Sequence, residues 1–144
     1  MKSHQILLAL LFICLSSCKD TGTQNFSQIA NSFGLTIPDT PHTFVVLPYH
    51  SCTMCVKLTW TILENEVDSS KKITIIDAYR NGKDPFQSVV SFPVYIDSNF
   101  IVENSSIGFT NPTIIHTDKG RVKSIVSTPS NKTEEILRKE LDSL

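Results

Sequence analysis

Apolar and polar residues follow two different patterns along the chain, and the first pattern predicts strands. Residues 43–47 and 72–79 are short, nearly continuous apolar runs rich in β-branched residues, as expected for strands buried on both faces. Residues 92–97 and 112–118 predict two more strands, and 121–127 alternates in the manner of a half-exposed fifth strand. We therefore expect a five-stranded sheet.

The second pattern is helical and occurs in residues 52–67 and 131–144. The apolar positions at helical spacing are Cys55, Leu58, Ile62 and Val67 in the first segment, and Ile136, Leu137 and Leu141 in the second. Ser130 or Asn131 offers a side-chain cap for the second helix. Both segments are predicted to lay one apolar face on the sheet.

The connections complete the expected topology. Residues 80–91 predict a turn and a short helix, and residues 98–111 a short helix or a loop. The dipeptide Lys119-Gly120 suits a tight hairpin between the last two strands. The predicted order is β-α-β-α-β-α-β-β-α, an α/β fold whose mostly parallel sheet is covered on both faces and ends in an antiparallel hairpin.

Length and charge narrow the possible functions. The chain has 144 residues, enough for one domain with a substantial core. With 13 basic and 14 acidic residues its net charge is −1, so no field of one sign is present to hold nucleic acid.

The N-terminus predicts export and anchoring. Residues 1–17 have a basic start and an apolar run of about 10 residues, too short to span a bilayer. The sequence Leu-Ser-Ser before Cys18 resembles a bacterial lipobox, which implies that Cys18 is lipidated; the alternative is a plain cleaved signal that leaves Cys18 as a free thiol. Residues 18–42 are interpreted as the lipidated cysteine and a tether, and 43–144 as the domain.

This interpretation places the protein on a bacterial membrane, facing the periplasm or the cell surface. The start of the expected mature chain, CKDTGTQ, also resembles surface lipoproteins of Bacteroidetes. Cys14 is lost with the signal, so the domain keeps two thiols, Cys52 and Cys55. Outside the cytoplasm thiols can oxidise, and each of these has the other as its obvious partner.

Cys52 and Cys55 sit where a buried strand gives way to a helix. The positive end of the helix dipole and its unpaired N–H groups stabilise a thiolate there and lower its pKa. Three residues along a helix bring the second sulfur beneath the first. The pair therefore predicts a redox dithiol in which Cys52 attacks a substrate disulfide and Cys55 resolves the mixed disulfide.

Two other uses of the pair compete with this one. A structural staple is disfavoured, because closing so short a loop removes little entropy from the unfolded chain. A zinc site needs two more ligands, and the candidates are only His50 and His116, without a second cysteine pair. We expect no metal and no cofactor beyond the redox-active disulfide itself.

The strand–CxxC–helix unit resembles the thioredoxin-like superfamily. A second marker is NPTIIHTDKGRVKSIV, residues 111–126, in which Pro112-Thr113 opens the strand before the last hairpin. Residues 92–122 are similar to the insert of the TlpA/ResA and peroxiredoxin-type branch. The resemblance covers roughly residues 43–142 and implies a thioredoxin-like fold.

The resemblance also implies residue roles. Pro112 is expected to be cis, to keep metal away from the thiols, and to present the backbone of Asn111 and Thr113 to an extended substrate. Three positions depart from the family pattern: Ser51 replaces the usual aromatic residue, Trp60 stands where proline is frequent, and Val46 stands where thioredoxin has a buried acid.

The remaining residues to consider are those around the cysteine pair and two that are expected to be structural. His50, two residues before Cys52, is a possible tuner of that thiol's pKa, whereas His116 and Trp60 are expected to be structural. Thr53 and Met54, between the cysteines, are expected to set the redox equilibrium, in a direction that the sequence does not give.

Three functions follow as hypotheses. The leading one is a membrane-anchored thiol–disulfide oxidoreductase that acts on extracytoplasmic protein disulfides or thiols and exchanges electrons with a membrane or thioredoxin-type donor. The second is a peroxiredoxin-like peroxidase, although Cys52 stands where that family's motif after Pro48 has a hydroxyl residue. The third is a copper-binding lipoprotein, since two thiolates suit Cu(I).

Overall fold

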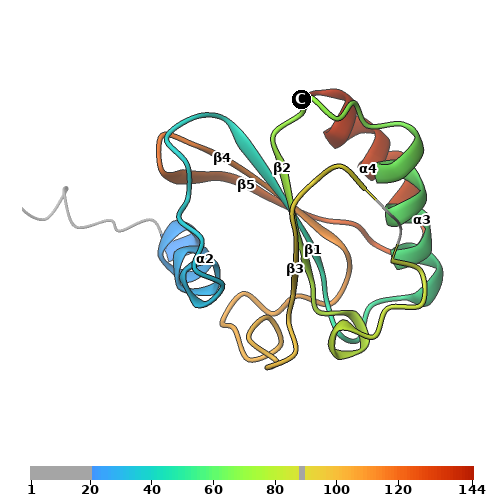
Figure 1. The fold of residues 1–144 in the computed structure, drawn as a ribbon, viewed down its shortest axis with the longest axis horizontal. Helices are drawn as coiled ribbons and strands as arrows, with labels where there is room; N and C mark the ends of the chain where they lie inside the picture. Colours follow the sequence, from blue (N-terminus) through green and yellow to red (C-terminus); the bar gives the residue numbers. More distant parts are fainter. Residues whose placement is uncertain (1–20, 88–89) are drawn as a thin grey trace, which may run out of the picture.

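The computed structural model describes residues 21–87 and 90–144, which form a mixed five-stranded sheet with helices on both faces (Figure 1). The strands are β1 (His42–Leu47), β2 (Ile73–Asp77), β3 (Val94–Ile96), β4 (Thr113–Asp118) and β5 (Arg121–Ser127). The helices are α2 (Thr21–Ser32), α3 (Thr53–Asn65), α4 (Thr133–Asp142) and a 3-10 turn η1 (Tyr79–Gly82). The α/β class predicted from the sequence is confirmed.

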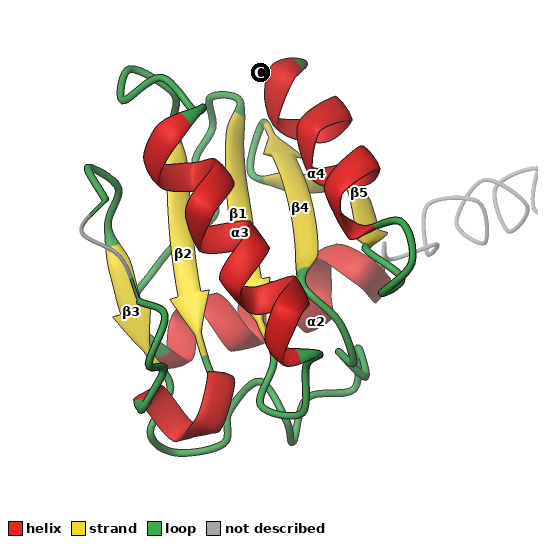
Figure 2. Cartoon of the chain, turned by 90° about the vertical axis from the view of Figure 1, so that its right-hand side faces the viewer, coloured by secondary structure: helices red, strands yellow, loops and turns green. Residues whose placement is uncertain are grey.

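The sheet has the strand order β3-β2-β1-β4-β5. Strands β1, β2 and β3 are parallel, whereas β4 runs antiparallel to β1 and pairs with β5 in a hairpin. The predicted antiparallel hairpin at one edge of the sheet is therefore confirmed. The carboxyl ends of β1 and β2 point to the edge where α3 begins (Figure 2).

The central strand β1 is buried on both sides, which explains its continuous apolar run. Val45 and Leu47 face α3 and α4 and belong to a core that includes Trp60. Phe44 and Val46 face the opposite side, toward α2. The two cores lie back to back on the sheet, with α2 on one face and α3 and α4 on the other (Figure 1).

The hairpin forms where the sequence predicts it. Lys119 and Gly120 both have a left-handed backbone, with φ of 53° and 69°, as a two-residue turn matched to strand twist requires. Only Gly adopts this conformation without strain, so the non-glycine residue at 119 carries a local cost.

Helix α2 departs from the expectation that residues 18–42 form a tether. Phe26, Ile29 and Ala30 recur at helical spacing and are buried, with the Phe26 ring 4.9 Å from that of Phe44. The tether interpretation is therefore wrong for α2, which packs on the sheet as part of the domain. The signal sequence and Cys18 lie outside the described residues.

The short helix expected within residues 80–91 is absent from the described residues, whereas residues 98–111, expected as a short helix or a loop, form a loop. After β2 the chain forms only the short turn η1, and residues 88–89 of the expected helix lie outside the described part. Residues 98–111 form turns around Asp97, whose buried carboxylate accepts N–H bonds from Asn99, Ile101 and Val102. A carboxylate at the strand end thus organises a loop without a helix.

The N-cap of helix α4 lies one residue after Asn131, the nearer of the two predicted caps. Its N-cap is Lys132, which makes no side-chain capping bond, so the prediction of Ser130 or Asn131 is wrong. The turn before it explains the difference, because the Lys132 N–H already donates to the Pro129 carbonyl, 2.8 Å away. Among the helices that the structure describes, none is long and apolar enough to cross a membrane.

Candidate active site at the Cys52–Cys55 disulfide

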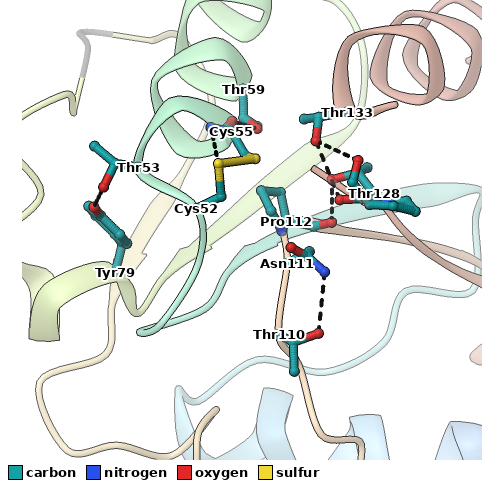
Figure 3. The surroundings of a disulfide bond; sticks show 11 residues. Cys52, Thr53, Cys55, Thr59, Tyr79, Thr110, Asn111, Pro112, Thr128 and Thr133 are labelled. Carbon is teal, nitrogen blue, oxygen red and sulfur yellow. Dashed lines mark hydrogen bonds between the residues drawn. A yellow bond between two sulfur atoms is a disulfide. The ribbon is translucent and has the colours of Figure 1, made fainter. Parts of the chain in front are cut away.

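Cys52 and Cys55 form a disulfide at the start of α3, with Cα atoms 5.1 Å apart (Figure 3). After β1 the chain turns, with the Ser51 N–H donating to the Pro48 carbonyl. Cys52 is the N-cap residue of α3, and its sulfur accepts the Cys55 N–H at 3.3 Å. The helix start therefore holds one sulfur where an N–H group can stabilise negative charge.

The two sulfurs differ in their exposure. Cys52 is half-buried, whereas Cys55 lies in the core and is only 3% exposed. The sulfur that a molecule in solution can reach is therefore that of Cys52, because Cys55 is shielded. This asymmetry agrees with the predicted roles of the attacking and the resolving cysteine.

An open groove of about 690 Å³ runs beside the disulfide. Its walls come from the first turns of α3 and from the start of α4, and include Met54, Leu58, Asn131 and Glu135. Met54 is 66% exposed, which is high for a large apolar side chain. The groove therefore offers mixed polar and apolar contacts beside Cys52.

The Pro112 segment lies in the surroundings of the disulfide (Figure 3), but its geometry differs from the expectation. The peptide bond before Pro112 is trans, so the predicted cis bond is wrong. Trans is the favoured isomer of an X–Pro bond by about 0.5–1 kcal/mol. The cis form was supported by the resemblance alone, and the intrinsic preference of the bond prevails.

The carbonyl groups of this segment are already engaged. The Pro112 carbonyl accepts both the N–H and the hydroxyl of Thr128, each at 2.9 Å. The Thr113 hydroxyl donates to the Asn111 carbonyl at 2.8 Å. Pro112 and Thr113 are buried and Asn111 is half-buried, so Asn111 is the member of the three that a substrate reaches most easily.

His50 is mostly exposed but has two close neighbours, Glu103 and Tyr49. Its Nε2 lies 3.1 Å from a Glu103 carboxylate oxygen, and its ring packs edge-on against Tyr49. The side chain is 74% exposed. The role of His50 in tuning the Cys52 thiol stays a prediction.

His116 has the structural role expected of it. Its Nδ1 lies 3.1 Å from the Thr43 hydroxyl and its Nε2 lies 3.0 Å from the Glu140 carboxylate. These bonds tie β4 to β1 and α4. In the described part of the chain no three His, Cys, Asp or Glu residues group closely enough to hold a metal ion.

Sequence reasoning missed two buried carboxyl groups on the side of the sheet that α3 covers. Asp77, at the end of β2, is fully buried, and one of its carboxylate oxygens has no partner among the described residues. Burial, reinforced by the nearby charge of Asp84, raises the pKa of Asp77 to about 7. Asp84 accepts the Trp60 indole N–H at 2.6 Å.

These acids have only a faint sequence signal, an aspartate that ends an apolar strand and another that follows seven residues later. Val46, which stands where the resemblance places an acid, is buried and apolar as expected. Val46 faces the α2 side of the sheet, whereas Asp77 lies at the end of the neighbouring strand β2.

Comparison with protein-family models, curated proteins and solved structures finds no match to this chain.

Proposed function

We propose that this protein is a membrane-anchored thiol–disulfide oxidoreductase with a thioredoxin-like fold. The observation that carries the proposal is the disulfide at the start of α3, with Cys52 accessible beside a groove and Cys55 buried. A cross-link between residues three apart adds little stability, so its position at a helix N-terminus is better explained by chemistry.

The reduced form carries out the exchange in two steps. The Cys52 thiolate attacks one sulfur of a substrate disulfide, forming a mixed disulfide and releasing the other substrate sulfur as a thiolate. The Cys55 thiolate then attacks the Cys52 sulfur, closing the internal disulfide and releasing the second substrate thiolate. Two electrons pass to the substrate, and an external dithiol donor must return them.

The setting of this reaction follows from the sequence. Cys18 carries the lipid anchor, and the domain faces the periplasm or the cell surface. The clients are extracytoplasmic proteins with disulfides or free thiols, and the donor is a membrane protein or a thioredoxin-type protein. The strand–CxxC–helix unit and the mixed sheet support a thioredoxin-like fold of the TlpA/ResA or peroxiredoxin-type branch.

The test uses the full chain in detergent with Cys14→Ser and Cys18→Ser, so that Cys52 and Cys55 are the only thiols. It is equilibrated with glutathione buffers, and free thiols are counted by alkylation. We expect a reversible two-electron transition and catalysed reduction of insulin by dithiothreitol. The Cys52→Ser variant is expected to be inactive, and Cys55→Ser to accumulate the mixed disulfide.

The proposal fails if the two thiols never pair reversibly. It also fails if Cys52→Ser reduces insulin as fast as the parent protein, because the exposed sulfur is then not the nucleophile.

A further inference from the structure

We propose that Tyr79 is a positioning residue for the redox pair, whose hydroxyl holds Thr53 and thereby favours the closed disulfide. The inference rests on the proposed function, because it concerns how readily Cys52 and Cys55 pair. Its observation is the 2.8 Å hydrogen bond between the Tyr79 phenol and the Thr53 hydroxyl (Figure 3).

Thr53 lies inside the CxxC motif, directly after Cys52. It is the first residue of α3 and lies between the two cysteines, and its side chain is exposed. Its hydroxyl nevertheless reaches back to a buried residue from another part of the chain, 26 positions away. A tie at this point restricts the backbone turn that brings Cys52 over Cys55.

Tyr79 itself is rigidly held. It is 2% exposed and belongs to the core between the sheet and α3. Its N–H donates to the Asp77 carboxylate at 3.0 Å, and the N–H of Ala78 donates to the Leu47 carbonyl at the end of β1. The phenol is therefore fixed relative to the strand that leads into the disulfide.

The conformation of Arg80, the residue after Tyr79, also indicates that this segment is constrained. Arg80 has a left-handed backbone, with φ of 48°, and its guanidinium carbon lies 5.3 Å from the Tyr79 ring centroid. Such a conformation costs energy in a residue other than glycine and persists where its surroundings determine it. The strained turn and the cation over the ring both keep the Tyr79 hydroxyl aimed at Thr53.

Holding Thr53 raises the effective concentration of one sulfur at the other. In the reaction with glutathione, the protein disulfide and two glutathione thiols give the protein dithiol and one glutathione disulfide. A preorganised first turn shifts this equilibrium toward the protein disulfide. Removing one ordinary hydrogen bond is expected to shift the constant toward the dithiol by about fivefold.

The experiment measures this constant in the full chain with Cys14→Ser and Cys18→Ser. Tyr79→Phe and Thr53→Val each remove one hydroxyl and are expected to shift the equilibrium about fivefold toward the dithiol. Thr53→Ser keeps a hydroxyl and is expected to restore the parent value. The double variant Thr53→Val/Tyr79→Phe is expected to shift no further than either single variant.

Matched controls distinguish the loss of the hydrogen bond between Tyr79 and Thr53 from a general loss of stability. Thr61→Val removes a hydroxyl from an exposed position of the same helix, and Tyr95→Phe removes a phenol from β3. Neither is expected to move the equilibrium. Thermal unfolding of both redox forms supplies a second readout, because the tie predicts that Tyr79→Phe destabilises the oxidised form more than the reduced form.

The inference is overturned if Tyr79→Phe leaves the constant unchanged, or if the two single shifts add in the double variant. This failure is distinct from that of the proposed function. A parent protein that titrates reversibly and reduces insulin upholds the oxidoreductase even where Tyr79→Phe has no effect.

Discussion

The two faces of the sheet are built on different principles. The core under α2 consists of apolar side chains such as Phe26 and Phe44, and the buried carboxylate beside it, Asp97, accepts three backbone N–H bonds. The face under α3 and α4 is also apolar, but it takes in the carboxyl groups of Asp77 and Asp84 beside the helix that carries the disulfide. The difference between the faces is that one oxygen of Asp77 has no hydrogen-bond partner among the described residues, so the α3 face carries a cost of burial that the α2 face avoids.

The largest loss of stability is expected from a substitution in the apolar core under α2. Phe26→Ala removes a fully buried ring and is expected to cost about 3–5 kcal/mol in the free energy of unfolding. Urea unfolding measures the loss, and Gln24→Ala on the exposed side of α2 serves as the control.

Because Phe26 lies across the sheet from α3, its loss is expected to leave the glutathione equilibrium of Cys52 and Cys55 unchanged. A shift in that equilibrium as large as the one expected for Tyr79→Phe would show that the two faces are coupled.

The second test acts on the polar face. Folded Asp77 keeps its proton up to a pH of about 7, whereas in the unfolded chain it loses it near 3.8. The folded state binds more protons in this window, so stability falls as pH rises from about 4 to 7. Asp77→Asn removes the charge and keeps the acceptor for the Tyr79 N–H.

The Asn variant is expected to be more stable than the parent at pH 8, by roughly 2–4 kcal/mol, and nearly equal to it at pH 4. Urea unfolding at the two pH values measures the difference. Equal stabilities at pH 8 would mean that Asp77 is ionised in the folded protein without cost.

The smallest effect is expected for His42, at the edge of the α2 face. Its contribution to stability depends on pH with the opposite sign to that of Asp77. Burial, with help from the Lys72 charge, lowers the pKa of His42, whose ring packs on Phe44. The unfolded chain binds the proton more tightly, so stability is lost as pH falls below 6.5. His42→Gln is expected to remove this loss, which is under about 1 kcal/mol because the ring is half-exposed.

Unfolding curves of the parent and His42→Gln at pH 7.5 and 5 measure that difference. A larger acid-side loss in the variant than in the parent would contradict a lowered His42 pKa in the folded protein.

Periodicity predicted the parts of the fold that bury long, regular apolar runs. The β1 and β2 runs and the helix after Cys52 are of this kind. Each contains enough apolar residues at the spacing of a strand or a helix for the local sequence to indicate the element. Helix α2 was missed because only Phe26, Ile29 and Ala30 mark it, among small polar residues. Its stability comes from tertiary packing on Phe44, which a local pattern does not contain.

The site was predicted unevenly for the same reason. Cys52 and Cys55 are close in sequence, so their pairing follows from helix geometry alone. The Tyr79 contact with Thr53 joins segments that meet only in three dimensions, and no spacing rule indicates it. The cis form of Pro112 was carried over from a resemblance, and the trans bond shows that a motif does not fix the isomer.

Helix α2 also contacts the edge strand β5, and this contact affects how the strand can associate with other chains. The Thr23 hydroxyl accepts the N–H of Val122 in the edge strand β5 at 3.0 Å. An edge strand with open N–H groups is a template on which another chain can add a strand. By occupying Val122, α2 denies an incoming chain one of the bonds it would need, and so helps to keep neighbouring copies from joining sheet to sheet.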